Sequence, residues 1–227
     1  MSKTPNHWFV KETAQDVAKT ACELIVSTAQ KLLLKKQQFN IVLAGGTTPE
    51  HVYSLLAKEN CDWKSWHIYL GDERCYPANN PERNSQMVER IFLNKVSIPK
   101  ENIHFIPAEL GAEQAAITYR KVVNDVLPFD MVLLGMGEDG HTASIFPEHN
   151  YSDMLAVEAV FNAPKNPPER VSLAFNSLSS NNNLIIMVTG KSKQEAVKKW
   201  KNGKDLPVAR ISSKGTKTIL LDKEAFS

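Results

Sequence analysis

An acidic side chain and an imidazole lie two residues apart in a glycine-rich stretch of the sequence. Asp139 and His141 flank Gly140 and follow Gly135 and Gly137. A neutral imidazole has an ordinary pKa of about 6.5, so it can take a proton from water near neutral pH. We predict that His141 is a general base and that Asp139 is a candidate to orient its ring. A glycine-rich turn with a helix-capping acid and an exposed histidine would have the same sequence.

A second glycine-rich turn has the residues of an anion site. Gly45, Gly46 and Thr47 precede Pro49 and Glu50. Thr47 and Glu50 have capping-box spacing, and proline suits a first helical turn. A helix that begins here would present unpaired N–H groups to an anion. An ordinary well-capped turn between a strand and a helix would have the same sequence. The pattern is neither a P-loop nor a dinucleotide fingerprint, so ATP and NAD are not indicated.

Charged residues occupy three further turns or loops. Asp72 and Arg74 lie just beyond an apolar run, Lys165 and Arg170 belong to a proline-rich loop, and Lys193 follows a Thr-Gly turn. Solvated connections often have this composition. The same residues could instead hold a phosphate, because Lys and Arg supply full charge to a dianion.

The hydrophobic pattern predicts the elements that must position these side chains. Helices are expected over 12–37, 87–92, 112–125 and 193–201, and strands over 39–44, 66–70, 103–106, 131–134, 155–161, 171–175, 184–188 and 218–221. Their alternation predicts an α/β fold, a parallel-rich open sheet with helices on both faces that is Rossmann-like and doubly wound. The candidate turns all follow strands. Because parallel strands end at one edge of a sheet, we expect these turns to converge.

Composition limits the classes of function. The 27 basic and 25 acidic residues nearly balance, which argues against a general nucleic-acid surface. The three cysteines, Cys22, Cys61 and Cys75, lack metal-type spacing and predict reduced thiols. No apolar run approaches the roughly 18 residues that cross a bilayer, and the first 15 residues lack a signal-peptide pattern. We expect one cytoplasmic domain over residues 1–227, with no membrane contact.

The turns identified above occur within five longer segments that carry a family resemblance. These segments are LAGGTTPEHVYSLL, WHIYLGDERCYP with the following NNPERNSQM, FDMVLLGMGEDGHTASIFP, APKNPPERVSLAF and LIIMVTGKSKQEAV. In their order and spacing the chain resembles the 6-phosphogluconolactonase family over nearly its whole length. The wider superfamily includes glucosamine-6-phosphate deaminase. Arg74 after Asp72 and the TASIFP sequence after His141 favour the lactonase.

The resemblance implies hydrolysis of 6-phospho-D-glucono-1,5-lactone to 6-phosphogluconate in the oxidative pentose phosphate pathway. It implies no metal, no organic cofactor and no obligate protein partner. Arg74 and Lys165 match basic family positions and would bind the phosphate with the Gly45–Thr47 turn. Lys193 matches the phosphate lysine of the deaminase relatives, or is a surface helix residue. Asp72 is expected to hydrogen-bond sugar hydroxyls or to steady Arg74.

Two other functions remain open from the sequence. A glucosamine-6-phosphate deaminase or isomerase needs an acid–base set beyond one histidine, and residues 142–147 replace the acid of those relatives with small or apolar side chains. A non-catalytic sugar-phosphate-binding module would keep the phosphate turn but would have no use for Asp139 and His141. We therefore expect the lactonase first, the deaminase second and the binding module third.

Overall fold

The computed structural model describes residues 6–152 and 154–227. Residues 1–5, part of the segment without a signal-peptide pattern, lie outside the described residues, and the single domain over 1–227 stays a prediction. A seven-stranded sheet dominates the described residues. Its strands, in spatial order, are β1 (Asn6–Lys11), β10 (Thr216–Asp222), β9 (Asn183–Val188), β6 (Met131–Gly135), β2 (Phe39–Leu43), β3 (Trp66–Leu70) and β5 (Ile103–His104). Every neighbouring pair is parallel, which confirms the predicted fold class.

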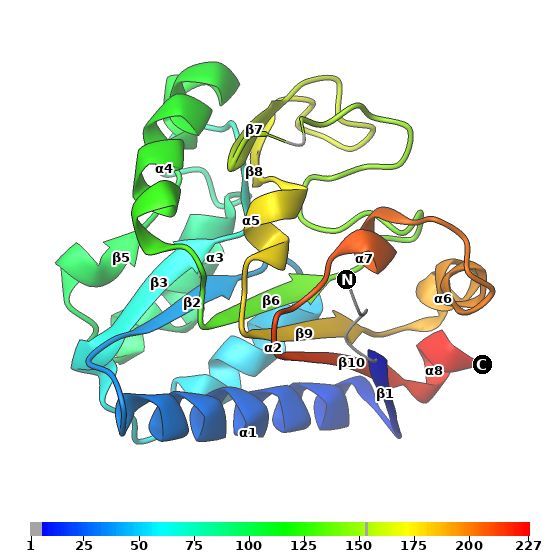
Figure 1. Cartoon of the computed structure of the whole chain (residues 1–227), viewed down its shortest axis with the longest axis horizontal. Helices are drawn as coiled ribbons and strands as arrows, with labels where there is room; N and C mark the ends of the chain where they lie inside the picture. The colour runs from blue at the N-terminus through cyan, green and yellow to red at the C-terminus, as the bar shows by residue number, and fades with distance from the viewer. Residues whose placement is uncertain (1–5, 153) are drawn as a thin grey trace.

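Helices lie on both sides of this sheet. Figure 1 shows α1 below the sheet and α4, α5 and α7 above it. The helices are α1 (Ala14–Leu33), α2 (Thr47–Leu56), α3 (Asn84–Ile91), α4 (Ala112–Val126), α5 (Phe175–Ser179), α6 (Gln194–Lys201), α7 (Pro207–Arg210) and α8 (Lys223–Phe226). Short 3₁₀ turns are η1 (Trp63–Ser65), η2 (Leu93–Lys95), η3 (Lys100–Asn102), η4 (Ala108–Leu110) and η5 (Lys191–Lys193). No helix in the described part of the chain has the length and apolarity to cross a membrane.

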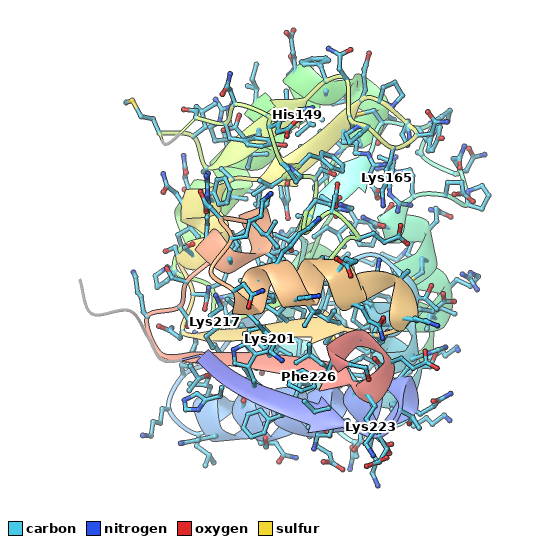
Figure 2. All side chains as sticks on the ribbon, turned by 90° about the vertical axis from the view of Figure 1, so that its right-hand side faces the viewer. His149, Lys165, Lys201, Lys217, Lys223 and Phe226 are labelled. Carbon is cyan, nitrogen blue, oxygen red and sulfur yellow. The ribbon has the colours of Figure 1, made fainter. Side chains whose placement is uncertain are left out.

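A smaller antiparallel sheet lies above the large one. It consists of β4 (Asp72–Arg74), β8 (Arg170–Leu173) and β7 (Val157–Val160) in that order. The strand predicted over 171–175 ends early, because Phe175 already begins α5. Figure 2 shows Lys165 and His149 in this upper part of the molecule, above α6 and Lys201.

The direction of chain growth reverses between two central strands. From β2 the chain moves outward to β3 and β5, then returns to the other side of β2 as β6 and continues to β9 and β10. All five residues of β2 and the first four of β6 are buried, because helices cover both faces there. In open α/β sheets ligands bind at the carboxyl ends of strands where the order reverses, so the β2–β6 boundary is the expected place for a site.

The capping box predicted for Thr47 and Glu50 is wrong, and so is a second one that the same spacing of Ser192 and Glu195 predicts before the helix over 193–201. Gly46, with φ of 106°, is the N-cap of α2 and Thr47 is its first residue. At the second position, η5 runs directly into α6, so that Lys193 rather than Ser192 precedes the helix. Neither helix has a side-chain hydrogen bond at its N-cap. A capping side chain must stand just before the first helical residue. Both α2 and α6 begin at a different residue from the predicted one, so the predicted side chains are not in the capping position.

Candidate active site

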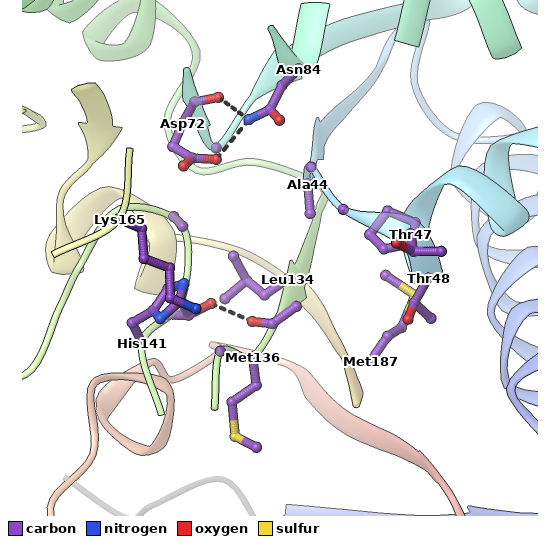
Figure 3. A pocket seen from close by; sticks show the side chains of 18 of the residues that line it. Ala44, Thr47, Thr48, Asp72, Asn84, Leu134, Met136, His141, Lys165 and Met187 are labelled. Carbon is purple, nitrogen blue, oxygen red and sulfur yellow. Dashed lines mark hydrogen bonds between the residues drawn. The ribbon is translucent and has the colours of Figure 1, made fainter. Parts of the chain in front are cut away.

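A pocket of about 460 Å³ opens at the carboxyl ends of β2, β3, β6 and β9. All the predicted site residues except Asp139 line it. These are Gly45, Gly46, Thr47, Asp72, Arg74, His141, Lys165 and Lys193. Figure 3 shows His141 and Lys165 on one side of the pocket, Thr47 and Thr48 on the other, and Asp72 with Asn84 at the top. The turns therefore meet at one edge of the sheet, as expected from the sequence.

Asp139 is in direct contact with His141. Its Oδ1 lies 2.5 Å from Nδ1 of the imidazole and also accepts from the His141 backbone N–H at 3.1 Å. Partial burial raises the pKa of Asp139, but the hydrogen bonds and charge of His141 outweigh it and hold that pKa well below 3.8. An ionised carboxylate can only accept, so Nδ1 carries the proton of this pair. In the neutral ring Nε2 then has the free lone pair.

The turn before His141 requires glycine. A Cβ on Gly137 would lie 2.0 Å from two ring atoms of His141, and the His141 carbonyl accepts from the Gly137 N–H at 2.8 Å. The imidazole also contacts Phe146, whose ring centroid is 4.7 Å from its own. The side chain of His141 is consequently only 14% exposed, although its loop lies at the pocket surface.

The N-terminus of α2 forms the facing wall. The Tyr53 hydroxyl binds both the N–H and the carbonyl of Ala44 at 2.8 Å and so fixes the end of β2. Thr48 hydrogen-bonds Thr189, which follows β9, at 2.6 Å. The N–H groups of a first helical turn have no partners within the helix, and they carry partial positive charge. This wall can therefore bind an anion.

Among the described residues, four cations line the same pocket: Arg74, Lys165, Arg170 and Lys193. Burial lowers the pKa of Lys193 below 10.5, Glu138 opposes that shift, and the charge of Lys165 lowers it further. The positive charges of these two lysines of the pocket wall thus repel each other. Arg74 donates through Nη1 to the Glu82 carbonyl. A phosphate dianion placed among these cations would relieve the repulsion between them.

Asp72 binds two side chains of the protein for which no contact was predicted. Its carboxylate accepts from Asn84 Nδ2 at 3.1 Å and from the Ser144 hydroxyl at 2.6 Å. Asp72 is therefore held by Asn84 and Ser144, and its predicted role of steadying Arg74 stays a prediction. It lines the pocket, so the predicted contact with sugar hydroxyls stays a prediction.

The family model for glucosamine-6-phosphate isomerases and 6-phosphogluconolactonase matches residues 12–220. The chain belongs to this family. It is 31% identical over 221 residues to the 6-phosphogluconolactonase of Haemophilus influenzae, covering 91% of this chain and 95% of that protein. It is 31% identical over 233 residues to the chloroplastic 6-phosphogluconolactonase 3 of Arabidopsis thaliana, covering 93% and 70%. The crystal structure of 6-phosphogluconolactonase from Thermotoga maritima superposes with a TM-score of 0.90 at 27% identity, covering 96% and 100%.

Sequence reasoning assigned no role to two polar residues that organise this family member's pocket. Glu73 is fully buried and accepts from the backbone N–H groups of Asn84 at 2.7 Å and Ser85 at 2.8 Å, which ties β4 to the start of α3. Asn84 then donates to the carbonyl and the carboxylate of Asp72. A buried acid at a helix start is favourable because it satisfies N–H groups of the first turn. In the sequence Glu73 stands between two other charged residues, Asp72 and Arg74, so no local signal marked it as a buried side chain.

Proposed function

We propose that the protein hydrolyses 6-phospho-D-glucono-1,5-lactone to 6-phosphogluconate, a step of the oxidative pentose phosphate pathway. One observation carries the proposal: His141, with Nδ1 held by an ionised Asp139, faces a pocket ringed by Arg74, Lys165 and Lys193. The family relatives named 6-phosphogluconolactonase support it. A base at one side of a cationic pocket suits a neutral ester that carries a distant phosphate.

The reaction needs one proton carrier. Nε2 of His141 takes a proton from water while the water oxygen bonds to the lactone carbonyl carbon. The tetrahedral oxyanion then collapses, the bond from that carbon to the ring oxygen breaks, and the imidazolium returns its proton to the ring oxygen. The product is an open-chain acid that ionises in water. Asp139 stabilises the imidazolium between the two steps and keeps the ring in one orientation.

Arg74, Lys165, Lys193 and the 45–47 turn would bind the phosphate, and Asp72 would bind sugar hydroxyls. Charge-assisted hydrogen bonds contribute about 1.5–3 kcal/mol each, or roughly a 10- to 100-fold change in affinity. Arg74→Ala and Lys165→Ala should therefore raise KM for the phosphorylated lactone much more than for glucono-1,5-lactone. Equal losses on the two lactones would remove these side chains from the phosphate site.

The deciding experiment compares two substrates. Fresh 6-phosphogluconolactone is coupled to 6-phosphogluconate dehydrogenase, with spontaneous opening subtracted, and glucosamine-6-phosphate is followed by ammonia release. We expect turnover of the lactone alone. Ammonia release without lactone hydrolysis would assign the deaminase reaction, and no turnover of either would leave a sugar-phosphate-binding module.

His141→Ala tests the base within the same assay. Loss of a general base costs about 10²–10⁴ in rate, so kcat should fall by that factor while 6-phosphogluconate still binds. We also infer that the reaction is metal-independent, because lactone opening needs only an activated water and a stabilised oxyanion. Undiminished activity after treatment with a chelator is the expected result. A cytoplasmic location stays a prediction, since the name of the Arabidopsis relative places it in chloroplasts.

A further inference from the structure

Arg170 is a buried cation in the wall of the pocket. It begins β8, pairs in register with Arg74 of β4, and is 5% exposed. Its Nε donates to the Pro167 carbonyl at 3.1 Å, and its Nη2 donates to the carbonyls of Lys165 at 3.0 Å and Asn166 at 2.8 Å. One guanidinium thus binds three consecutive carbonyls of the loop that carries Lys165.

This loop has few backbone donors of its own. Pro164, Pro167 and Pro168 have no N–H group, and the Ala163 N–H donates to the Pro168 carbonyl at 3.0 Å. A loop that is poor in donors depends on side chains from outside to satisfy its carbonyls. Arg170 supplies such donors to Lys165 and its neighbours, and the ammonium of Lys165 is a candidate phosphate ligand.

The guanidinium also lies over an aromatic ring. Cζ of Arg170 lies 5.6 Å from the ring centroid of Phe146, which is 1% exposed. A guanidinium over a ring face is held by cation–π attraction. Lysine cannot reproduce this arrangement, because its ammonium is a point donor that neither stacks nor spans three carbonyls.

We propose that Arg170 is a positioning residue for the lactonase reaction: it holds the Lys165 backbone where the ammonium of Lys165 reaches the substrate phosphate. The proposal rests on the proposed function. Two other roles would use the same buried position. Arg170 could contact the substrate directly, since it lines the pocket, or it could support the small sheet in general.

A double-mutant cycle separates these roles. Arg170→Lys, Lys165→Met and the double variant are compared with the parent protein, with kcat and KM measured on 6-phosphogluconolactone and on glucono-1,5-lactone. We expect Arg170→Lys to raise KM for the phosphorylated lactone about 10-fold with kcat changed less than about 3-fold, as for loss of one charge-assisted contact. In the Lys165→Met background the same substitution should add less than about 2-fold, because coupled residues are non-additive.

Arg120→Lys is the matched control. Arg120 on α4 donates through Nη2 to the Val157 carbonyl of β7 at 3.0 Å and does not line the pocket, so it supports the same small sheet from outside. We expect its KM ratio between the two lactones to stay at the parent value. Circular dichroism and thermal unfolding establish that each variant folds.

Three results would overturn the proposal. A full KM increase in the Lys165→Met background would show that Arg170 acts independently of Lys165. Equal losses on both lactones in Arg170→Lys would show general structural support. So would a change in the KM ratio of Arg120→Lys as large as that of Arg170→Lys. If the parent protein hydrolyses no lactone, the proposed function fails. The cycle is then run as calorimetric binding of 6-phosphogluconate and inorganic phosphate, where additive losses or absence of binding would again reject the role of Arg170.

Discussion

The backbone of Gly137 lies against the imidazole of His141 so closely that a Cβ at Gly137 would be 2.0 Å from Nδ1 and Cε1 of the ring. No real Cβ contact is that short. The imidazole of Gly137→Ala must therefore rotate away from Asp139 or the loop must shift. Misplacing a reacting group by about 1 Å can cost about 10²-fold in rate, so we expect kcat to fall about 10²-fold.

The control for this variant is Gly111→Ala, measured by the same lactone assay and by thermal unfolding. Gly111 has φ of 83° but open space around its Cβ position, and it precedes α4. The Gly111→Ala variant should be less stable than the parent protein and should keep its lactonase activity. Parent-like kcat in Gly137→Ala would mean that the position of His141 is not set by this contact.

Asp139→Asn keeps the shape of the side chain and removes its charge. The pKa of Asp139 in the folded protein lies below 3.8, so its charged contact with His141 is present above the ordinary pKa and is lost only as the pH falls through the lower folded value. The asparagine amide can donate to Nδ1, which would favour the tautomer with the proton on Nε2, and that nitrogen then cannot act as the base. We expect kcat to fall about 10²- to 10⁴-fold at neutral pH, as for loss of a general base.

The measurement for Asp139→Asn is the pH–rate profile on fresh lactone, together with binding of 6-phosphogluconate. Binding should be retained, because Asp139 does not line the pocket. A variant with unchanged kcat but weaker binding would place Asp139 in substrate binding instead.

Gly45 and Asn84 form a second close approach. A Cβ at Gly45 would lie 2.0 Å from Oδ1 of Asn84, whose amide group holds Asp72. Overpacking costs about 1–3 kcal/mol. That strain falls on the turn before α2 and on Asp72, both in the pocket wall. A strain of about 1.4 kcal/mol corresponds to a factor of ten, so we expect Gly45→Ala to lower kcat/KM about 10-fold.

Asn84→Ala provides the test of this explanation. It removes the side chain with which the new methyl group collides, so Gly45→Ala should cost less in the Asn84→Ala background than in the parent protein. Additive losses in kcat/KM would mean that the two residues act separately.

Lys193 predicts a pH dependence of binding. Burial lowers the pKa of Lys193 below 10.5. Lys193 therefore loses its proton, and with it its positive charge, at a lower pH than an ordinary lysine. Calorimetric affinity for 6-phosphogluconate should therefore fall as the pH rises from neutral into the alkaline range. Lys193→Arg should move the fall to higher pH, and Lys193→Met should bind weakly with a smaller pH dependence. An identical pH profile in all three proteins would exclude Lys193 from the phosphate site.

Several site residues could be predicted because their signals are local. Residues 43–47, 70–74 and 134–141 each show a strand end followed by glycine and a polar or charged side chain, and parallel strands bring such turns to one edge. Asn84 and Glu73 were assigned no role, and Arg170 was predicted only as a solvated residue or a phosphate ligand. Asn84 and Glu73 connect β4 to the start of α3, and that connection depends on how the two elements meet in the fold. Arg170 binds backbone carbonyls three to five residues before it, and such acceptors occur in every residue type.

The sequence by itself determined the alternation of strands and helices, the family and the turns that carry the chemistry, because hydrophobic period and glycine position act over a few residues. Only the tertiary structure decided that Asp139 binds the His141 ring, that Asp72 binds Asn84 and Ser144, and that α2 begins at Thr47 with Gly46 as its cap. Hydrogen-bond partners are chosen among all groups that packing brings within about 3 Å, and distance along the chain does not decide that choice.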